Sequence, residues 1–208
     1  MVDKKKVIFF GVQSATLGDF SEIAMRLQIS PIYIDNLAED LGRAPSDSIS
    51  VKDLEDFHLK LPVVISIVTP AHRLSAMNHA INLGFTDFPA FISPNADIAA
   101  NAIIEPGVFV NNSAIIGHST KLAKNSVVNR GANIGHDVEI GEFTHVAPSA
   151  CILGFSKIGK SVLVGANSTI LNNLNIGDGA IIGAGAVVIH DVASGETVVG
   201  NPARPIAR

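Results

Sequence analysis

A six-residue period in the second part of the chain constrains its fold more than any other feature. A branched aliphatic residue stands at every sixth position from Ile92 to Val188, and small residues recur two positions earlier. Glycine often follows directly, as at Gly117, Gly135 and Gly141. This period matches neither the 3.6-residue turn of an α-helix nor the two-residue alternation of a strand. It is typical of a parallel β-helix in which three hexapeptides form one triangular coil and the aliphatic residues point inward.

The first 90 residues lack this period and alternate between apolar and amphipathic segments. We expect strands at 6–11, 31–35 and 61–68, and helices at 19–27 and 71–83. Such alternation predicts a small parallel α/β sheet. The predicted fold class is therefore an α/β N-terminal Rossmann-like domain, residues 1–90, followed by a left-handed parallel β-helix of hexapeptide repeats, residues 91–208. The segment from Gly200 onward leaves the period, and we expect it to fold back as a C-terminal tail.

Composition excludes several functions and compartments. The 208 residues carry a formal net charge of −4, so nucleic acid is not an expected partner. The lone cysteine, Cys151, excludes an intramolecular disulfide and suits a reducing cytoplasm. No apolar stretch approaches the length of a membrane span, so we expect no membrane insertion. These features together predict a cytoplasmic location.

The α/β sheet predicts where a ligand would bind in the first domain. In open parallel sheets, ligands lie at the carboxyl ends of the strands. Here those ends are 11–14, 35–36 and 68–70. Gln13, Ser14, Asp35 and Asn36 are the expected substrate-binding residues by this position.

Histidines in the repeat are the clearest candidates for acid–base chemistry. His118 and His136 are eighteen residues apart, so they should stack on one face in adjacent coils, whereas His145 lies half a coil further on. A surface imidazole in a repeat usually has no role. His136, however, is followed by Asp137, which can fix its tautomer and raise its basicity. This pair is the expected general base.

Two stretches of the repeat resemble a known family. The segments 129–136 and 140–148, with the Gly-Asn-Pro-Ala-Arg ending at 200–204, are similar to bacterial hexapeptide-repeat sugar acetyltransferases. That family includes sialic-acid O-acetyltransferases and nucleotide-aminosugar N-acetyltransferases. The resemblance implies that His136 is the general base, supported by Asp137. It also implies that His145 contacts the acetyl group of acetyl-CoA and that Asn129 helps to hold the acceptor sugar.

The same resemblance implies a binding site for acetyl-CoA. Gly154 matches the position closest to the thioester, while Ala166 and Ala184 should line the pantetheine channel; ordinary corner packing explains these three residues equally well. We expect a homotrimer in which His136 faces the three residues of a neighbouring subunit. In the first domain, the turn at 11–16 lacks the second glycine and the histidine usual in the family. The contacts to a pyrophosphate therefore stay open, although Asp35 and Asn36 fit the family's acidic strand end.

The leading functional hypothesis is acetyl transfer from acetyl-CoA to the amino group of a nucleotide-linked 4-amino-4,6-dideoxy-type sugar. Such a reaction belongs to lipopolysaccharide or other surface glycan biosynthesis, and no metal is expected in it. One alternative is O-acetylation of a sugar hydroxyl. Another is a non-catalytic or zinc-dependent hexapeptide protein, in which His118, His136 and His145 would converge at a subunit interface. The nucleotide, the sugar and the acyl chain remain open.

Overall fold

The structure, a computed structural model, describes residues 5–37 and 41–206. The chain divides into two compact units, Met1–Pro89 and Ala90–Arg208, within one residue of the expected boundary. The first unit is an α/β fold, and the second is a β-helix.

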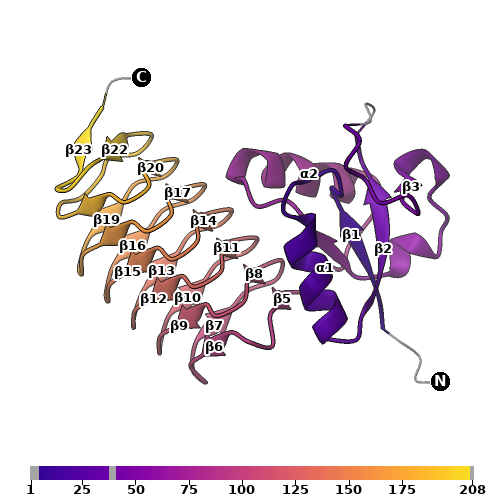
Figure 1. Ribbon diagram of the computed structural model, residues 1–208, viewed down its shortest axis with the longest axis horizontal. Coiled ribbons are helices and arrows are strands. Elements are labelled where there is room, and N and C mark those ends of the chain that lie inside the picture. The colour runs from indigo at the N-terminus through magenta and orange to yellow at the C-terminus, as the bar shows by residue number, and fades with distance from the viewer. Residues whose placement is uncertain (1–4, 38–40, 207–208) are drawn as a thin grey trace. The chain divides into compact units, whose positions relative to one another are not determined.

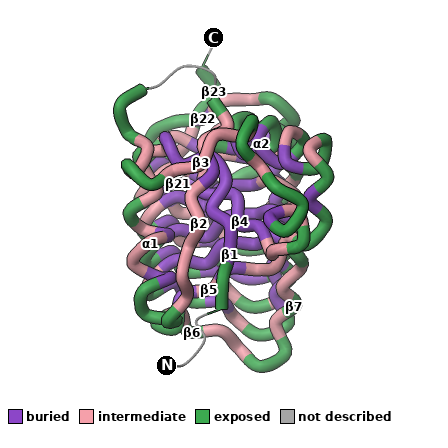
Figure 2. Tube along the Cα trace, turned by 90° about the vertical axis from the view of Figure 1, so that its right-hand side faces the viewer, coloured by how far each residue is buried: buried purple, intermediate pink, exposed green. Residues whose placement is uncertain are grey.

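The first unit is built on a parallel four-stranded sheet with the order β3-β2-β1-β4. Its strands and helices are β1 (Lys6–Phe10), α1 (Leu17–Arg26), β2 (Ser30–Asp35), β3 (Ile49–Ser50), β4 (Val63–Ile65) and α2 (Pro70–Asn82), with 3-10 turns at Val51–Asp53 and His58–Lys60. The neighbouring strands β1 and β4 are almost fully buried, which Figure 2 shows in purple. Helix α1 packs Phe20, Ile23 and Ala24 inward.

Three details of this unit differ from the sequence-based expectation. The third expected strand, 61–68, is reduced to Val63–Ile65. Strand β3 was not expected, because two residues are too few to show an alternation. Leu27, expected on the buried stripe of the first helix, follows the end of α1 and is exposed.

The second unit consists of three sheets of short strands, one on each side of a left-handed β-helix, and the strands are parallel except for the last one, β23 (Figure 1). The first sheet contains β5 (Phe91–Ile92), β8 (Phe109–Val110), β11 (Val127–Val128), β14 (His145–Val146), β17 (Leu163–Val164), β20 (Ile181–Ile182), β22 (Thr197–Val199) and β23 (Arg204–Pro205). The second contains β6 (Asp97–Ile98), β9 (Ile115–Ile116), β12 (Asn133–Ile134), β15 (Cys151–Ile152), β18 (Thr169–Ile170) and β21 (Val187–Val188). The third contains β7 (Ile103–Ile104), β10 (Lys121–Leu122), β13 (Glu139–Ile140), β16 (Lys157–Ile158) and β19 (Asn175–Ile176).

The aliphatic residue of each hexapeptide forms the core, as the period predicted. From Val110 to Val188, the aliphatic residue at every sixth position is buried, and these residues belong to one continuous cluster. Each such side chain contributes roughly 1.5–3 kcal/mol by leaving water. In the regular coils, partners are eighteen residues apart, as in Ile134 paired with Ile152. One turn of the β-helix therefore takes three hexapeptides.

The core continues beyond the regular period. A four-residue step leads from Val188 to Val192, which bridges to Ile176, and Val198 then pairs with Ile182. The last coil has thus lost two residues at one corner while keeping its core positions filled. Strand β23 returns antiparallel to β22, so the expected fold-back of the tail is confirmed.

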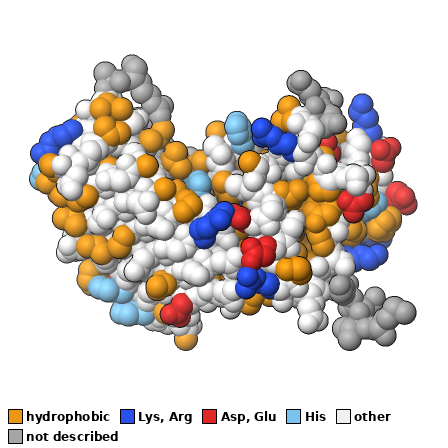
Figure 3. All heavy atoms as spheres, viewed as in Figure 1, with side chains coloured by type: hydrophobic (Ala, Val, Ile, Leu, Met, Phe, Trp, Pro, Cys, Tyr) orange, Lys and Arg blue, Asp and Glu red, His pale blue; other side chains and the backbone are white. Residues whose placement is uncertain are grey.

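The surface carries no broad charged region on the face drawn in Figure 3. Lys and Arg side chains stand there in small groups, several of them next to Asp or Glu. Among the described residues, no helix combines the length and apolar character needed to cross a membrane.

Candidate active site

One corner of the β-helix, directly after β12, presents His136 and Asp137 to the surface. Asp137 has a left-handed backbone, with φ of 55°. Its N–H donates to the carbonyl of His118 at 2.9 Å, and the N–H of Phe155 donates to the carbonyl of His136 at 3.1 Å. The corner is therefore tied to the coils on both sides, which fixes the direction in which the His136 side chain leaves the backbone.

The imidazole and the carboxylate of this corner form a hydrogen-bonded pair. Nδ1 of His136 lies 2.9 Å from Oδ2 of Asp137, and the two side chains are 48% and 34% exposed. A carboxylate accepts from Nδ1–H, so the neutral ring carries its proton on Nδ1. The lone pair on Nε2 is then free to accept a proton from a bound molecule.

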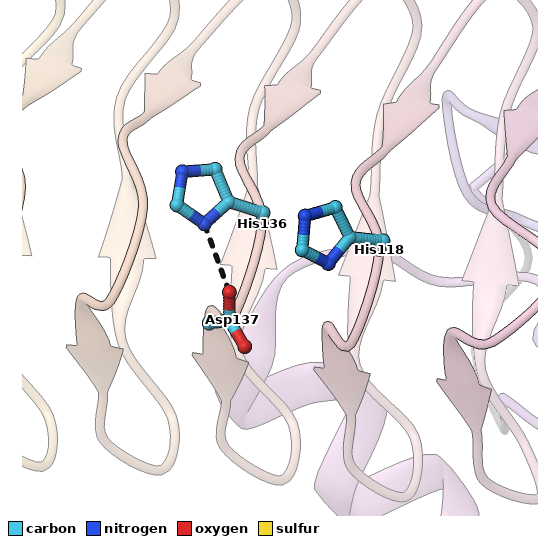
Figure 4. Close-up of side chains that lie close together, drawn as sticks. All are labelled: His118, His136 and Asp137. Carbon is cyan, nitrogen blue, oxygen red and sulfur yellow. Dashed lines mark hydrogen bonds and ion pairs between the residues drawn. The ribbon is translucent and has the colours of Figure 1, made fainter.

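Three further residues surround the ring of His136. His118 stacks on it, with the ring centroids 5.2 Å apart and the planes at 14°, as the sequence predicted (Figure 4). Phe155 meets it edge-on, with centroids 4.9 Å apart. Gly154 lies so close that a Cβ at this position would stand 2.7 Å from Cε1 and 2.8 Å from Nε2 of His136. Glycine at 154 therefore leaves room for the imidazole.

The position of Gly154 corrects one expectation. We expected Gly154 of a neighbouring subunit to face His136, but within a single chain the two residues already touch. They are eighteen residues apart and occupy the same corner in adjacent coils. Ala166 and Ala184 follow β17 and β20 of another sheet, and thus lie at a different corner.

His145 and Asn129 lie apart from His136, on and next to the first sheet. His145 belongs to β14 and is only 8% exposed, although the sequence suggested a surface imidazole. Asn129 Oδ1 accepts from Asn111 Nδ2 at 2.9 Å and from the N–H of Arg130, so Asn129 Nδ2 donates to His145 Nε2 at 3.3 Å. This hydrogen-bond chain gives His145 the neutral tautomer with the proton on Nδ1.

The zinc-dependent alternative places His118, His136 and His145 together at a subunit interface; within one chain, His145 does not join the other two. Donor atoms of His118, His136 and Asp137 all lie within 4.8 Å of one another. His145, on the first sheet, is not part of this group among the described residues. Its place is taken by Asp137.

In the first unit, a pocket opens at the carboxyl ends of the parallel strands, where the sequence predicted a ligand. It is lined by residues that include Gly11, Gln13, Ser14, Asn36 and Thr69. The hydroxyl groups of Ser14 and Thr16, which both line this pocket, form a hydrogen bond of 2.7 Å. Three of the four expected substrate-binding residues thus reach the pocket wall.

The fourth, Asp35, stands behind that wall. Its Oδ2 accepts from Gln13 Nε2 at 2.8 Å, and its Oδ1 accepts from the N–H of Leu37 at 3.1 Å. Gln13 is nearly buried, and its Oε1 accepts from the N–H of Leu41. Asp35 therefore holds the Gln13 side chain and the backbone of Leu37 in place.

The sequence analysis missed three basic residues at this pocket. Arg43 and His72 line it. Arg73 is buried behind it, donating to the carbonyls of Ile65 and Ile67 at the end of β4. Burial lowers the pKa of Arg73 to about 9, so its guanidinium remains charged at neutral pH. His72 could have been found as an early residue of the helix that starts at the strand end, whereas no local signal marks Arg43.

Cys151 does not belong to either site. It lies on β15 and is half-buried, and burial raises the pKa of its thiol. A raised pKa keeps the thiol protonated, which is unfavourable for a nucleophile.

Comparisons with known proteins agree with the repeat and with the fold. Residues 155–190 match the family model described as bacterial transferase hexapeptide (six repeats). No curated protein matches the sequence. The acetyltransferase domain of PglB from Neisseria gonorrhoeae, solved with acetyl coenzyme A, is 25% identical, with a TM-score of 0.86 over 98% of this chain and 100% of that chain.

Two further solved structures share the fold. PerB from Caulobacter crescentus, solved with CoA and GDP-perosamine, is 21% identical, with a TM-score of 0.84 over 100% of this chain and 99% of that chain. WeeI from Acinetobacter baumannii is 24% identical, with a TM-score of 0.82 over 98% of this chain and 100% of that chain. The resemblance to hexapeptide-repeat sugar acetyltransferases is therefore confirmed, in the repeat and in a fold shared over nearly the whole chain.

Proposed function

We propose that this chain is an acetyl-CoA-dependent N-acetyltransferase that acts on a nucleotide-linked amino sugar. The observation that carries the proposal is the His136–Asp137 pair, whose free Nε2 lies against Gly154 on a fold shared with an acetyltransferase solved with acetyl coenzyme A. A 4-amino-4,6-dideoxy-type sugar destined for a surface glycan such as lipopolysaccharide is the acceptor we favour, since PerB was solved with GDP-perosamine.

The chemistry requires one proton to leave the acceptor. As the amine nitrogen attacks the acetyl carbonyl carbon, a new N–C bond forms, and Nε2 of His136 accepts the proton. The C–S bond then breaks, and the imidazolium of His136 gives its Nε2 proton to the sulfur, so that CoA leaves as the thiol. Asp137 keeps the Nδ1 proton in place and stabilises the imidazolium. The oxyanion formed on the carbonyl requires preplaced donors, for which a backbone N–H at the Gly154 corner is suited.

The acceptor's nucleotide would bind in the pocket of the first unit. The sheet order β3-β2-β1-β4 supports a Rossmann-like unit, and in such parallel sheets ligands bind at the carboxyl ends of the strands. Gln13, Ser14 and Asn36 offer hydrogen bonds there, and Arg43 offers a positive charge to the phosphates. Asn129 would help to hold the sugar.

Acetyl-CoA would bind along the small residues of the β-helix. Ala166 and Ala184 leave space at their corner, but this corner is not the one that carries His136. A complete site therefore requires a second chain, and we propose a homotrimer in which adjacent β-helices form three equivalent grooves. His145 would contact the acetyl group. Sedimentation at micromolar concentration tests this assembly, and a monomer would contradict it.

The same geometry would also serve an O-acetyltransferase, because a hydroxyl loses its proton in the same way as an amine. The two reactions differ in their products, an amide or an ester, which mass spectrometry with mild alkaline hydrolysis separates. Both would take place in the cytoplasm, where acetyl-CoA and nucleotide sugars are made.

The decisive experiment replaces His136. His136→Ala should lower the turnover number by about two to four orders of magnitude, the usual size of a general-base effect. It should leave acetyl-CoA affinity nearly unchanged, since the lost interaction matters mainly as the proton moves. His190→Ala is the matched control, because His190 is exposed at the same repeat position further along the column. A His136→Ala enzyme with more than about a tenth of wild-type turnover would contradict the role of His136 as the general base.

The substrate is found by a separate screen. UDP-, dTDP- and GDP-linked amino sugars are added to the full chain with and without CoA, and the melting temperature is recorded. A ligand that binds only the folded state raises the melting temperature. A rise with one nucleotide and no rise with the other two identifies the base.

A further inference from the structure

The corner that carries the base also brings together three groups that can bind a metal ion. His118, His136 and Asp137 each offer a donor atom, and these atoms all lie within 4.8 Å of one another. Figure 4 shows the two imidazoles side by side, with the carboxylate next to one of them. His118 and His136 are exposed, so their rings can turn without disturbing the core.

The donor set and the spacing suit zinc. Zn²⁺ takes neutral imidazole nitrogen and carboxylate oxygen at about 2.0–2.2 Å, with three protein ligands and one open position in many sites. Two ligands of one ion therefore lie within about 4 Å of each other. The His136 and Asp137 atoms are already 2.9 Å apart, so a small rotation of the His118 side chain completes the set.

We propose that His118, His136 and Asp137 form an inhibitory site for Zn²⁺ or a similar divalent transition metal. The ion is not a cofactor of the acetyl transfer. Instead it competes with the transfer, because His136 cannot coordinate a metal and keep a free Nε2. If Nε2 binds the ion, its lone pair is used directly. If Nδ1 binds the ion, the proton of the neutral ring must move to Nε2.

His118 makes the proposal testable, because it has no part in the proposed acetyl transfer. Its ring stacks on that of His136, and its Nδ1 lies 3.4 Å from Oγ of Ser119. Removing it should abolish the metal site and leave the His136–Asp137 pair in place. Metal binding and catalysis can therefore be separated in one variant.

The first measurement is binding, which does not depend on the proposed function. Tag-free full-length chain is titrated with Zn²⁺ by calorimetry and with Co²⁺ by visible absorption, for wild type, His118→Ala and the control His190→Ala. We expect one ion per chain in the wild type and the control. Affinity in His118→Ala should fall at least about tenfold, since even residues that only support a metal ligand cost ten- to a hundredfold. Equal affinity in wild type and His118→Ala would overturn the site.

The second measurement is inhibition, and it rests on the proposed function. Acetyl transfer by the wild type should fall as Zn²⁺ rises and recover with a chelator, while His118→Ala should keep most of its activity at the same Zn²⁺ concentration. Zinc bound in the wild type without any loss of transfer would overturn the inhibition. If no acetyl transfer is found at all, the proposed function fails, and the binding titration still decides the site.

Discussion

The β-helix and the α/β unit differ in how far apart in the sequence the interacting residues are. In the β-helix, His136 meets His118 and Gly154, each eighteen residues away, and the strands pair at the same interval. In the α/β unit, Gln13 bonds to Asp35 over 22 residues and to Leu41 over 28, while Thr16 bonds to Ser66 over 50. The regular coils of the β-helix share one repeating distance, whereas these contacts of the α/β unit have none in common.

This difference decides how a site can be built. In the β-helix, the proposed active-site corner forms once the right residues occupy equivalent positions of neighbouring coils. The backbone bonds to the carbonyls of His118 and His136 then fix the geometry. In the α/β unit, the pocket depends on loops that follow three different strands. Gln13 is held there by side-chain and backbone partners rather than by a repeating backbone.

The largest expected effect comes from breaking the repeat itself. Ile140 is 1% exposed in the middle of the column. Ile140→Asp would bury a carboxylate without a partner and should lower the free energy of unfolding by more than about 4 kcal/mol. The damage should spread to the neighbouring coils, because each coil of a solenoid is stabilised by its neighbours. Hydrogen exchange should show faster exchange in β10 and β16, with the α/β unit protected.

Glu139→Ala is the control for that variant, since Glu139 is adjacent, exposed and outward-facing. It should unfold at nearly the wild-type temperature. Exchange that accelerates equally in both units of Ile140→Asp would show that the two units unfold together. The damage would then not be limited to the β-helix.

The next effect in size concerns the site rather than the fold. Gly154→Ala would place a Cβ 2.7 Å from Cε1 of His136, and the three heavy atoms nearest to that Cβ all belong to the His136 ring. The ring can swing away, so the fold should survive while the base is displaced. Turnover should fall about tenfold to a hundredfold, as positioning errors near 1 Å do.

Asn172→Ala tests whether that loss is specific to the contact. Asn172 is exposed at the same corner in the next coil. It should retain its turnover number, and both variants should keep the wild-type melting temperature. A Gly154→Ala enzyme with normal kcat would mean that His136 needs no fixed position.

The regular unit could be predicted residue by residue, whereas the irregular unit could be predicted only in outline. The period predicted the buried column, the stacking of His118 on His136 and the outward direction of both. It did not predict the four-residue step to Val192, because a shortened corner leaves no periodic signal. In the α/β unit, strand ends predicted the place of the pocket. They did not predict the hydrogen bond from Gln13 to Asp35, since that contact depends on tertiary packing.

Asp35→Ala should have a moderate effect on ligand binding. The proposed nucleotide pocket loses the support of Gln13 rather than a direct contact, so nucleotide-sugar affinity should fall about tenfold, the worth of one good hydrogen bond to a charged group. Gln13→Ala should cause a similar loss. The double variant should lose little more than either single one, because both changes remove the same interaction. Fully additive losses, measured by calorimetry, would mean that Asp35 contacts the nucleotide by itself.

The smallest expected effect concerns a surface ion pair of the β-helix. Glu105 accepts from Lys121 Nζ at 2.9 Å and from the N–H of Lys124 at 3.1 Å. The hydrogen bond from Lys121 is the main reason that the pKa of Glu105 lies below its ordinary value of 4.5.

A folded-state pKa below the unfolded one means that this stabilisation is present above about pH 4.5 and disappears as the pH falls through the folded value. Glu105→Gln should therefore lower the melting temperature by at most about 2 °C at pH 7, because exposed ion pairs are screened by water and salt. At pH 3 the variant and the wild type should melt closer together. Glu139→Gln, which breaks the more exposed pair with Lys157, should have even less effect at pH 7. A difference for Glu105→Gln that grows toward pH 3 would contradict the sign of the shift. It would also mean that charges on the surface of this repeat stabilise it differently from those of an ordinary exposed pair.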